Sequence, residues 1–295
     1  TYLLRSSVYN SSNVELDRIE EYFVKSYNGI PRFGIDENNS ICLNGVPFFP
    51  VTSFGLNNAD IPDWTTDRVT HPEYTDADPA SALVNTLTSY GFWPKDHTVE
   101  GWGTYLDLAS TAGVKVIGPG AWDVGTIASQ IYCGRYSDTS SLIQYVQVFN
   151  DNVSQIAWGW KDEPDLGGPT EEIPPTVVRS WTFLSHKYSG EQLTYTNVCG
   201  PNYVYTAYSR PASYTYLGTK SALGTNKSLA DIISFDYYPY DWRITRRAQD
   251  CSIAGYLAGV ELLIEENPYN PVMNYIETAD IRDDVNLIKS DTSKE

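Results

Sequence analysis

The sequence lacks an apolar run of the roughly 18 residues that a membrane-spanning helix needs, and it shows no signal peptide. It also lacks an excess of positive charge, since 20 lysines and arginines stand against 37 aspartates and glutamates. The formal net charge of -17 would repel phosphate groups, so we expect no nucleic-acid partner. We expect no membrane span, and we interpret the start at Thr1 as a processed or trimmed end.

Motifs for metals and nucleotides are missing as well. The cysteines have no Cys-x-x-Cys spacing and the 3 histidines are scattered, with His186 expected on a helix surface, so no metal site is predicted. No Gly-rich phosphate loop follows the first expected strand, which argues against the nucleotide-binding folds. A Gly-x-Ser-x-Gly nucleophile motif is also absent. We therefore expect neither a metal nor an organic cofactor.

Tyrosine and tryptophan, by contrast, are abundant: there are 23 Tyr and 8 Trp but only 9 Phe and 1 Met. Their apolar faces and polar edges suit sugar rings, and they suit a Tyr-rich secreted surface equally well. Four Asn-x-Ser/Thr sequons fit a glycosylated, extracellular chain. The sequons start at Asn10, Asn38, Asn152 and Asn226.

The four cysteines of such a chain could form two disulfides, for which three pairings are open, or they could remain free buried thiols. They are Cys42, Cys133, Cys199 and Cys251.

The first part of the chain is predicted to be an arm followed by a helix, which together make up residues 1–32. The helix is expected at 14–27, because Leu16, Ile19, Tyr22 and Phe23 have helical spacing. Residues 33–295 are predicted to form one domain. It begins with a β-hairpin, since Asn44-Gly45 lies between two strand-like runs.

Strands and helices alternate through the rest of the chain, which is typical of βαβ units and a parallel sheet. Strands are expected at 48–54, 114–118, 156–160, 193–198, 232–238 and 272–277, and helices at 79–90, 101–112, 140–152, 175–188, 221–229 and 253–266. A long loop is expected at 57–79.

This pattern favours an α/β fold of the TIM (β/α)8 type. About seven strands can be placed, and too few residues follow Glu277 for an eighth strand and its helix. We therefore expect a barrel that is truncated before or within strand eight. In such a barrel, the functional side chains lie where strands end and the following loops begin.

Two glutamates occupy such places. Glu163 follows the strand at 156–160, and Glu277 ends the strand at 272–277. Strands four and seven of a barrel lie on facing sides, so both carboxyls would point into one bowl. Retaining glycosidases need two carboxyls about 5 Å apart. We therefore predict Glu163 as the general acid/base and Glu277 as the nucleophile.

The order of these segments resembles clan A of the glycoside hydrolases. In that clan, strand four ends in Asn-Glu-Pro with the acid/base Glu, and strand seven ends in the nucleophile Glu. Here the matching residues are Asp162-Glu163-Pro164 and Glu277, so Asp162 stands where the clan commonly has Asn. Similar stretches at 44–50, 105–117 and 231–240 extend the resemblance over roughly residues 33 to 280.

Further residues are predicted to line the sugar site, with core or turn roles as the alternative. A tyrosine at the end of strand six could hydrogen-bond Glu277 and keep it ionised. Tryptophans at strand ends or in the following loops could serve as sugar platforms. The predicted substrate-binding set is Asp162, Asn197, Tyr237, Tyr238, Trp122, Trp160 and Trp242.

Together these patterns predict a secreted retaining hydrolase that acts on β-linked oligo- or polysaccharides. Two alternatives stay open. One is an inactive barrel that binds glycan or builds an extracellular assembly, with self-association allowed. The other is a transglycosylase that uses the same residues with a sugar acceptor in place of water.

Overall fold

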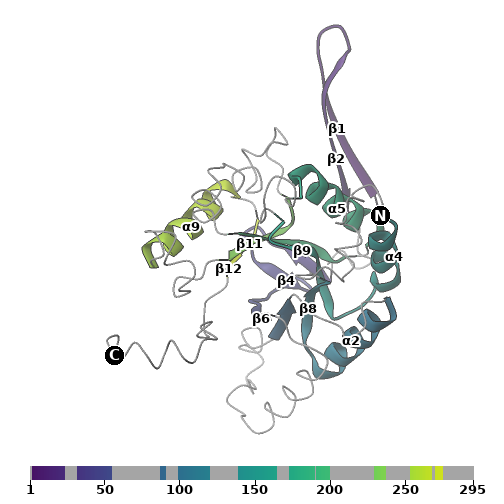
Figure 1. Cartoon of the computed structure of the whole chain (residues 1–295). Helices are drawn as coiled ribbons and strands as arrows, with labels where there is room; N and C mark the ends of the chain where they lie inside the picture. Colours follow the sequence, from purple (N-terminus) through teal and green to yellow (C-terminus); the bar gives the residue numbers. More distant parts are fainter. Residues whose placement is uncertain are drawn as a thin grey trace.

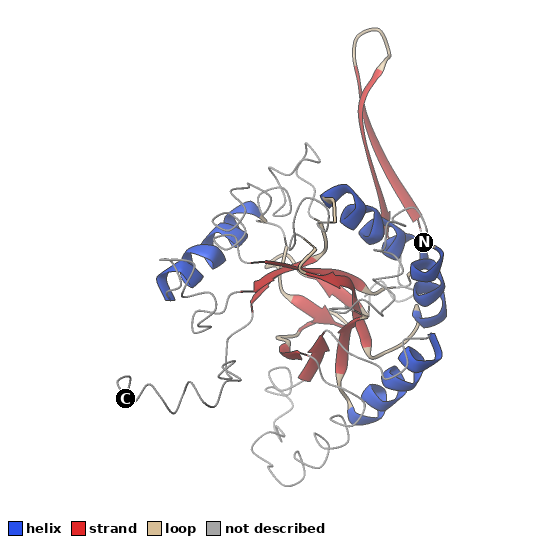
Figure 2. Ribbon diagram, in the orientation of Figure 1, coloured by secondary structure: helices blue, strands red, loops and turns tan. Residues whose placement is uncertain are grey.

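The computed structural model describes residues 2–23, 32–54, 87–90, 99–119, 139–164, 173–189, 191–199, 229–236, 253–267 and 270–274. Its centre is a parallel sheet with helices packed around it (Figure 1, Figure 2). No helix within these residues is long and apolar enough to cross a bilayer.

Among the described residues, the central sheet has seven strands, and their order along the sheet is their order along the chain. The strands are β6 (Val51–Phe54), β7 (Leu87–Tyr90), β8 (Lys115–Gly118), β9 (Gln155–Asp162), β10 (Leu193–Cys199), β11 (Ile232–Asp236) and β12 (Val272–Asn274). Every neighbouring pair is parallel. This sequential order is typical of a (β/α) barrel, because the strand order of a doubly wound sheet reverses at a switch point.

Within the described residues, four helices cover the sheet, and they confirm the helices expected at 101–112, 140–152, 175–188 and 253–266. They are α2 (Val99–Ala112), α4 (Ser140–Phe149), α5 (Pro175–Tyr188) and α9 (Ile253–Glu266). Gly113 ends α2 with φ 72°, a left-handed conformation that glycine adopts without strain. Pro175 starts α5 at a position where its missing N–H costs nothing.

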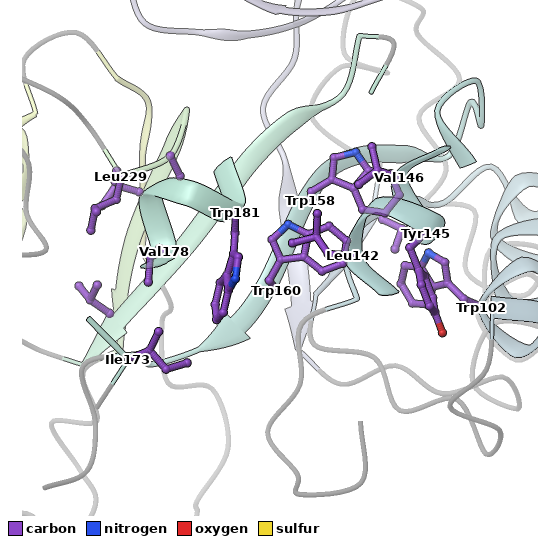
Figure 3. Close-up of a cluster of buried hydrophobic side chains, with 14 of the residues drawn as sticks. Trp102, Leu142, Tyr145, Val146, Trp158, Trp160, Ile173, Val178, Trp181 and Leu229 are labelled. Carbon is purple, nitrogen blue, oxygen red and sulfur yellow. The ribbon is translucent and has the colours of Figure 1, made fainter. Parts of the chain in front are cut away.

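A layer rich in tryptophan fills the space between sheet and helices (Figure 3). Trp158 and Trp160 of β9 stack with ring centroids 5.3 Å apart, and Trp102 and Trp181 come from α2 and α5. Residues two apart on a strand point to the same side, so both β9 tryptophans face the helices. Large aromatic rings dominate the burial energy of such a layer.

A second apolar cluster lies on the opposite face of the sheet, against a small antiparallel sheet. The small sheet consists of β3 (Phe33–Ile35), β4 (Ile41–Leu43) and β5 (Val46–Pro47), and its last turn is Asn44-Gly45 with φ of 51° and 79°. The members of the cluster are Phe33, Ile41, Phe48, Ile117, Ile156, Ala157, Leu193, Tyr195 and Ile232. Because Leu193 and Ile232 begin their strands, the small sheet covers the amino-terminal end of this inner face.

The helix expected at 14–27 is wrong: β1 (Tyr2–Tyr9) and β2 (Glu15–Phe23) form an antiparallel hairpin instead. The side-chain oxygen of Asn10 accepts the backbone N–H groups of Ser12 and Val14, each at 2.9 Å, and Asn13 has φ 61°. These hydrogen bonds and the positive φ of Asn13 favour a hairpin turn. They outweigh the weak helical spacing of the residues that follow. The hairpin projects from the rest of the molecule (Figure 1).

The helix expected at 79–90 is also wrong at its end, where Leu87–Tyr90 form strand β7. Pairing with β6 and β8 decides the structure of these four residues, and Thr88 and Tyr90 suit a strand. The expected loop at 57–79 and residues 221–228 of another expected helix lie outside the described residues.

Candidate active site

Three residues form a row across three neighbouring strands, at the carboxyl end of β9, near that of β10 and in the middle of β11. In the sheet register, Asn197 of β10 stands opposite Asp162 of β9 on one side and Ser234 of β11 on the other. The small sheet covers the other end of the strands, so this row lies at the end that a barrel uses for function.

Glu163 directly follows this row and has an unusual backbone. Its φ is 43°, and it is 7% exposed. Its backbone N–H donates to the carbonyl oxygen of Asn197 at 3.0 Å. A glutamate rarely adopts a left-handed backbone, because its Cβ then crowds the following carbonyl. Such conformations persist only where neighbours hold them, and they cluster at functional sites.

A chain of buried hydrogen bonds supports Asn197 from the inner face of the sheet. The hydroxyl of Ser234 donates to Oδ1 of Asn197 at 2.6 Å, and the hydroxyl of Tyr195 lies 2.5 Å from Oγ of Ser234. Since Ser234 gives its proton to Asn197, the Tyr195 hydroxyl donates to Ser234. Asn197 and Ser234 are 0% exposed and Tyr195 is 3% exposed. Buried polar groups are costly unless they are hydrogen-bonded, and this chain bonds each of them.

Asn197 was predicted from the sequence as a residue of the sugar site, whereas Tyr195 and Ser234 were not. A signal for them existed in the alternation of the strands. Tyr195 belongs to the inner cluster and Asn197 follows two residues later, while Ser234 interrupts the apolar strand Ile232–Asp236. A lone serine in a parallel strand that is buried on both faces needs a polar partner.

Trp160 does not belong to the row, which corrects its place among the predicted sugar platforms. Its ring is 4% exposed in the helix-facing layer (Figure 3). Its indole N–H donates to Oγ of Ser185 on α5 at 2.9 Å. Trp158 lies on the same side, because only residues an odd number apart on a strand point to opposite faces.

Of the other predicted site residues, Asp162 is placed by the register of its backbone. Glu277, Tyr237, Tyr238, Trp122, Trp242 and the sequon Asn226 lie outside the described residues.

His186 lies on helix α5, as expected, but it is half-buried rather than exposed, and it lies at the opposite end of the strands. Its Nε2 is 2.7 Å from Oδ2 of Asp231, which also accepts the backbone N–H and the hydroxyl of Thr194 at 2.7 and 2.8 Å. Burial by itself raises the pKa of Asp231. His186 and these hydrogen bonds lower the pKa, and their combined effect exceeds that of burial, so the pKa lies below its usual value. The cluster lies where β10 and β11 begin. In a barrel, residues at this end of the strands contribute to stability rather than to catalysis.

Cys42 is a buried free thiol of β4, so two disulfides that use all four cysteines are not present. Its Sγ donates to the carbonyl of Ser40 at 3.6 Å, and burial, followed by the nearby Asp36 carboxylate, raises the pKa of the thiol. Within the described segments, no cluster of three or more His, Cys, Asp or Glu could hold a metal ion.

Three predicted sequons lie in described turns. Asn10 and Asn38 are exposed, and Asn152 is half-buried with its side-chain oxygen accepting the N–H groups of Ser154 and Gln155. Glycosylation of these residues stays a prediction.

Solved structures with a similar fold include glycosidases. A β-glucuronidase from Ruminococcus gnavus in complex with D-glucaro-d-lactam aligns with a TM-score of 0.51 and 15% identity, over 90% of this chain and 40% of that chain. The same enzyme with uronic deoxynojirimycin gives 0.50 and 12%, over 91% and 41%. The chain has a glycosidase-like α/β fold. β-Glucuronidase 2 from Bacteroides uniformis aligns more loosely, with a TM-score of 0.48 and 11% identity over 92% and 29%.

This chain spans about two fifths of the length of the Ruminococcus gnavus enzyme, 40% in the first alignment. No protein-family model matches the sequence, and no curated protein matches it either. At these identities the likeness concerns the fold, so the activity has to be argued from the site.

Proposed function

We propose that this chain carries the catalytic barrel of a retaining glycosidase that cleaves β-linked glycans. Glu163 carries the proposal: a buried glutamate with a left-handed backbone, at the carboxyl end of the fourth strand of a glycosidase-like sheet. The β-glucuronidases with this fold support the choice of a glycosidase.

In the proposed reaction, Glu163 and Glu277 share the work over two steps. Glu277 follows β12 in the sequence, and as a carboxylate it attacks the anomeric carbon while Glu163 protonates the departing glycosidic oxygen. The glycosidic bond breaks and a glycosyl ester of Glu277 forms. Glu163 then takes a proton from water, whose oxygen attacks the anomeric carbon and releases Glu277. No metal or organic cofactor takes part in these steps.

The remaining predicted residues would bind the sugar. Asp162 and Asn197 lie beside Glu163 in the register, and we propose that Tyr237, Tyr238, Trp122 and Trp242 surround the same bowl. Because the neighbouring folds are β-glucuronidases, 4-nitrophenyl β-glucuronide is the first substrate to test, followed by the galactoside and the glucoside.

The test compares Glu163→Gln and Glu277→Gln with Glu265→Gln, which changes an exposed glutamate of α9 in the same way. On a phenyl glycoside, whose leaving group needs a proton, loss of the general acid/base or of the nucleophile should lower kcat/KM by roughly 10²- to 10⁴-fold, and the α9 variant should match the wild type. Activity of either site variant on this phenyl glycoside at the wild-type level contradicts the proposal. If the wild type binds glycans and cleaves none of these substrates, the inactive barrel replaces it.

Product analysis separates hydrolysis from transfer. Wild-type protein that releases free sugar in the presence of an acceptor oligosaccharide is a hydrolase, whereas elongated acceptor identifies a transglycosylase. We also propose an extracellular location, on the basis of the four sequons. An endoglycosidase-sensitive mass shift of the protein purified from its source tests that location.

A further inference from the structure

Asn197 is bound at both its side chain and its backbone, and the two bonds lead to different strands. Its Oδ1 accepts the hydroxyl of Ser234 on β11, whose oxygen in turn accepts the hydroxyl of Tyr195. Its carbonyl oxygen accepts the N–H of Glu163 just after β9. A single residue therefore connects the buried hydrogen-bond chain to the backbone of the glutamate.

The sheet register changes where this connection is made. Tyr195 stands opposite Gly159, but Asn197 stands opposite Asp162, so two residues along β10 match three residues along β9. The extra residue in β9 is a β-bulge, a feature that bends a strand and re-aims the side chains beyond it. Glu163 is the next residue after the bulged segment, and its φ is 43°.

A left-handed glutamate needs such support, because relaxation to an extended backbone would remove the strain. That relaxation would swing the Glu163 carboxyl to another direction and break its N–H bond to Asn197. Fixing the Asn197 carbonyl opposes the change. A general acid must meet the glycosidic oxygen within hydrogen-bond distance, so a small displacement costs catalysis.

We infer that Tyr195, Ser234 and Asn197 form a positioning device for Glu163. The inference rests on the proposed function, in which Glu163 is the acid/base. The three residues act through the backbone of Glu163. The Tyr195 hydroxyl holds Ser234, the Ser234 hydroxyl holds the side chain of Asn197, and the backbone carbonyl of the Asn197 so fixed accepts the Glu163 N–H.

The decisive measurement is the dependence of the rate on the leaving group. The phenolate of a phenyl glycoside needs a proton from Glu163 in order to leave, whereas the 2,4-dinitrophenolate of a 2,4-dinitrophenyl glycoside leaves without one. Ser234→Ala should therefore lower kcat/KM for phenyl β-glucuronide by about tenfold or more and change it less than about twofold for 2,4-dinitrophenyl β-glucuronide. Ser234→Thr, which keeps the hydroxyl, should restore most of the loss.

Ser185→Ala is the matched control. It removes the same hydroxyl from a serine that is also 0% exposed, but Ser185 bonds to Trp160 in the helix-facing layer. It should change the two rates by the same factor. An equal loss on both substrates in Ser234→Ala would show a merely structural role and overturn the inference.

Glu163→Gln distinguishes a failure of the positioning device from a failure of the proposed function. Suppose that Glu163→Gln loses activity on the phenyl substrate and keeps its kcat/KM on the dinitrophenyl substrate, whereas Ser234→Ala changes kcat/KM by the same factor on both. The positioning device then fails and the proposed function stands. If Glu163→Gln itself lacks this pattern, the proposed function fails.

Hydrogen exchange tests the device without any substrate. The Glu163 amide should exchange about tenfold faster or more in Ser234→Ala than in the wild type, because its acceptor is no longer fixed, and it should be unchanged in Ser185→Ala. Equal exchange in the wild type and both variants overturns the positioning role even where no glycoside is cleaved.

Discussion

The indole N–H of Trp160 lies 2.9 Å from Oγ of Ser185, and this bond ties β9 to α5 on the side of the sheet away from the inner cluster. Trp158 stacks on Trp160 with an interplanar angle of 2°. The strand that carries Glu163 is thus anchored by aromatic packing on one face and by its register with β10 at its end.

Replacing Trp160 tests whether the ring is core or sugar platform. Trp160→Phe removes part of a buried ring and leaves Ser185 without its donor, so the free energy of unfolding should fall by about 1 to 3 kcal/mol in urea titrations. KM for the cleaved glycoside should change less than about twofold, because the ring does not reach the substrate. An increase in KM without a loss of stability would instead show that Trp160 contacts the substrate.

Because the backbone of Glu163 is left-handed, glycine and alanine variants at this position should have the opposite order of stability to that found inside a helix. Glu163→Ala and Glu163→Gly remove the same side chain, but only glycine adopts a left-handed φ without strain. The glycine variant should therefore be more stable than the alanine variant by about 1 kcal/mol. At exposed Glu261 inside α9, alanine should be the more stable by about 1 kcal/mol. The same order at both sites would contradict a left-handed Glu163.

The elements that the sequence predicted best carry their signals locally. The expected ranges 175–188 and 253–266 coincide with α5 and α9, because apolar spacing, and for α5 Pro175 at the first turn, mark them without help from the fold. Asn44-Gly45 likewise specifies its own turn through two residues with positive φ. The strand that ends before Glu163 can be predicted in the same way, from its run of aromatic and apolar residues.

The misplaced features depend on partners that no local window contains. Leu87–Tyr90 become a strand only through pairing on both sides, and β2 becomes one because the turn after Asn10 aligns it with β1. The bulge in β9 that precedes Glu163 exists only as a mismatch with β10. Tertiary pairing overrides propensity in each case.

Asp231 predicts how stability responds to acid. Its folded pKa lies below its ordinary value of 3.8, so its contribution to stability is present above that pH and is lost as the pH falls through the folded value. Asp231→Asn should lower stability near neutral pH, and the gap to the wild type should narrow as the pH falls below 3.8. Urea unfolding at a series of pH values measures the gap. A gap that stays constant down to pH values well below 3.8 would show that the Asp231 charge contributes nothing.

A glycine in α9 is predicted to resist the substitution that usually stabilises a helix. A Cβ at Gly259 would lie 2.8 Å from Cζ of Phe235, which is 1% exposed in the helix-facing layer of β11. Helix propensity favours alanine over glycine by about 1 kcal/mol, but overpacking against a buried ring costs about 1 to 3 kcal/mol. Gly259→Ala should therefore lower the melting temperature.

Gly103→Ala in α2 is the control for Gly259→Ala, because its Cβ would meet Cε1 of the half-buried Phe149 at 3.3 Å, a contact that a small ring shift relieves. Gly103→Ala should leave the melting temperature unchanged or raise it. In a Phe235→Leu background the clash is gone, and Gly259→Ala should then be neutral or stabilising, which a double-mutant cycle of urea midpoints measures. A loss of equal size in both backgrounds would show that α9 does not pack on β11 through this glycine.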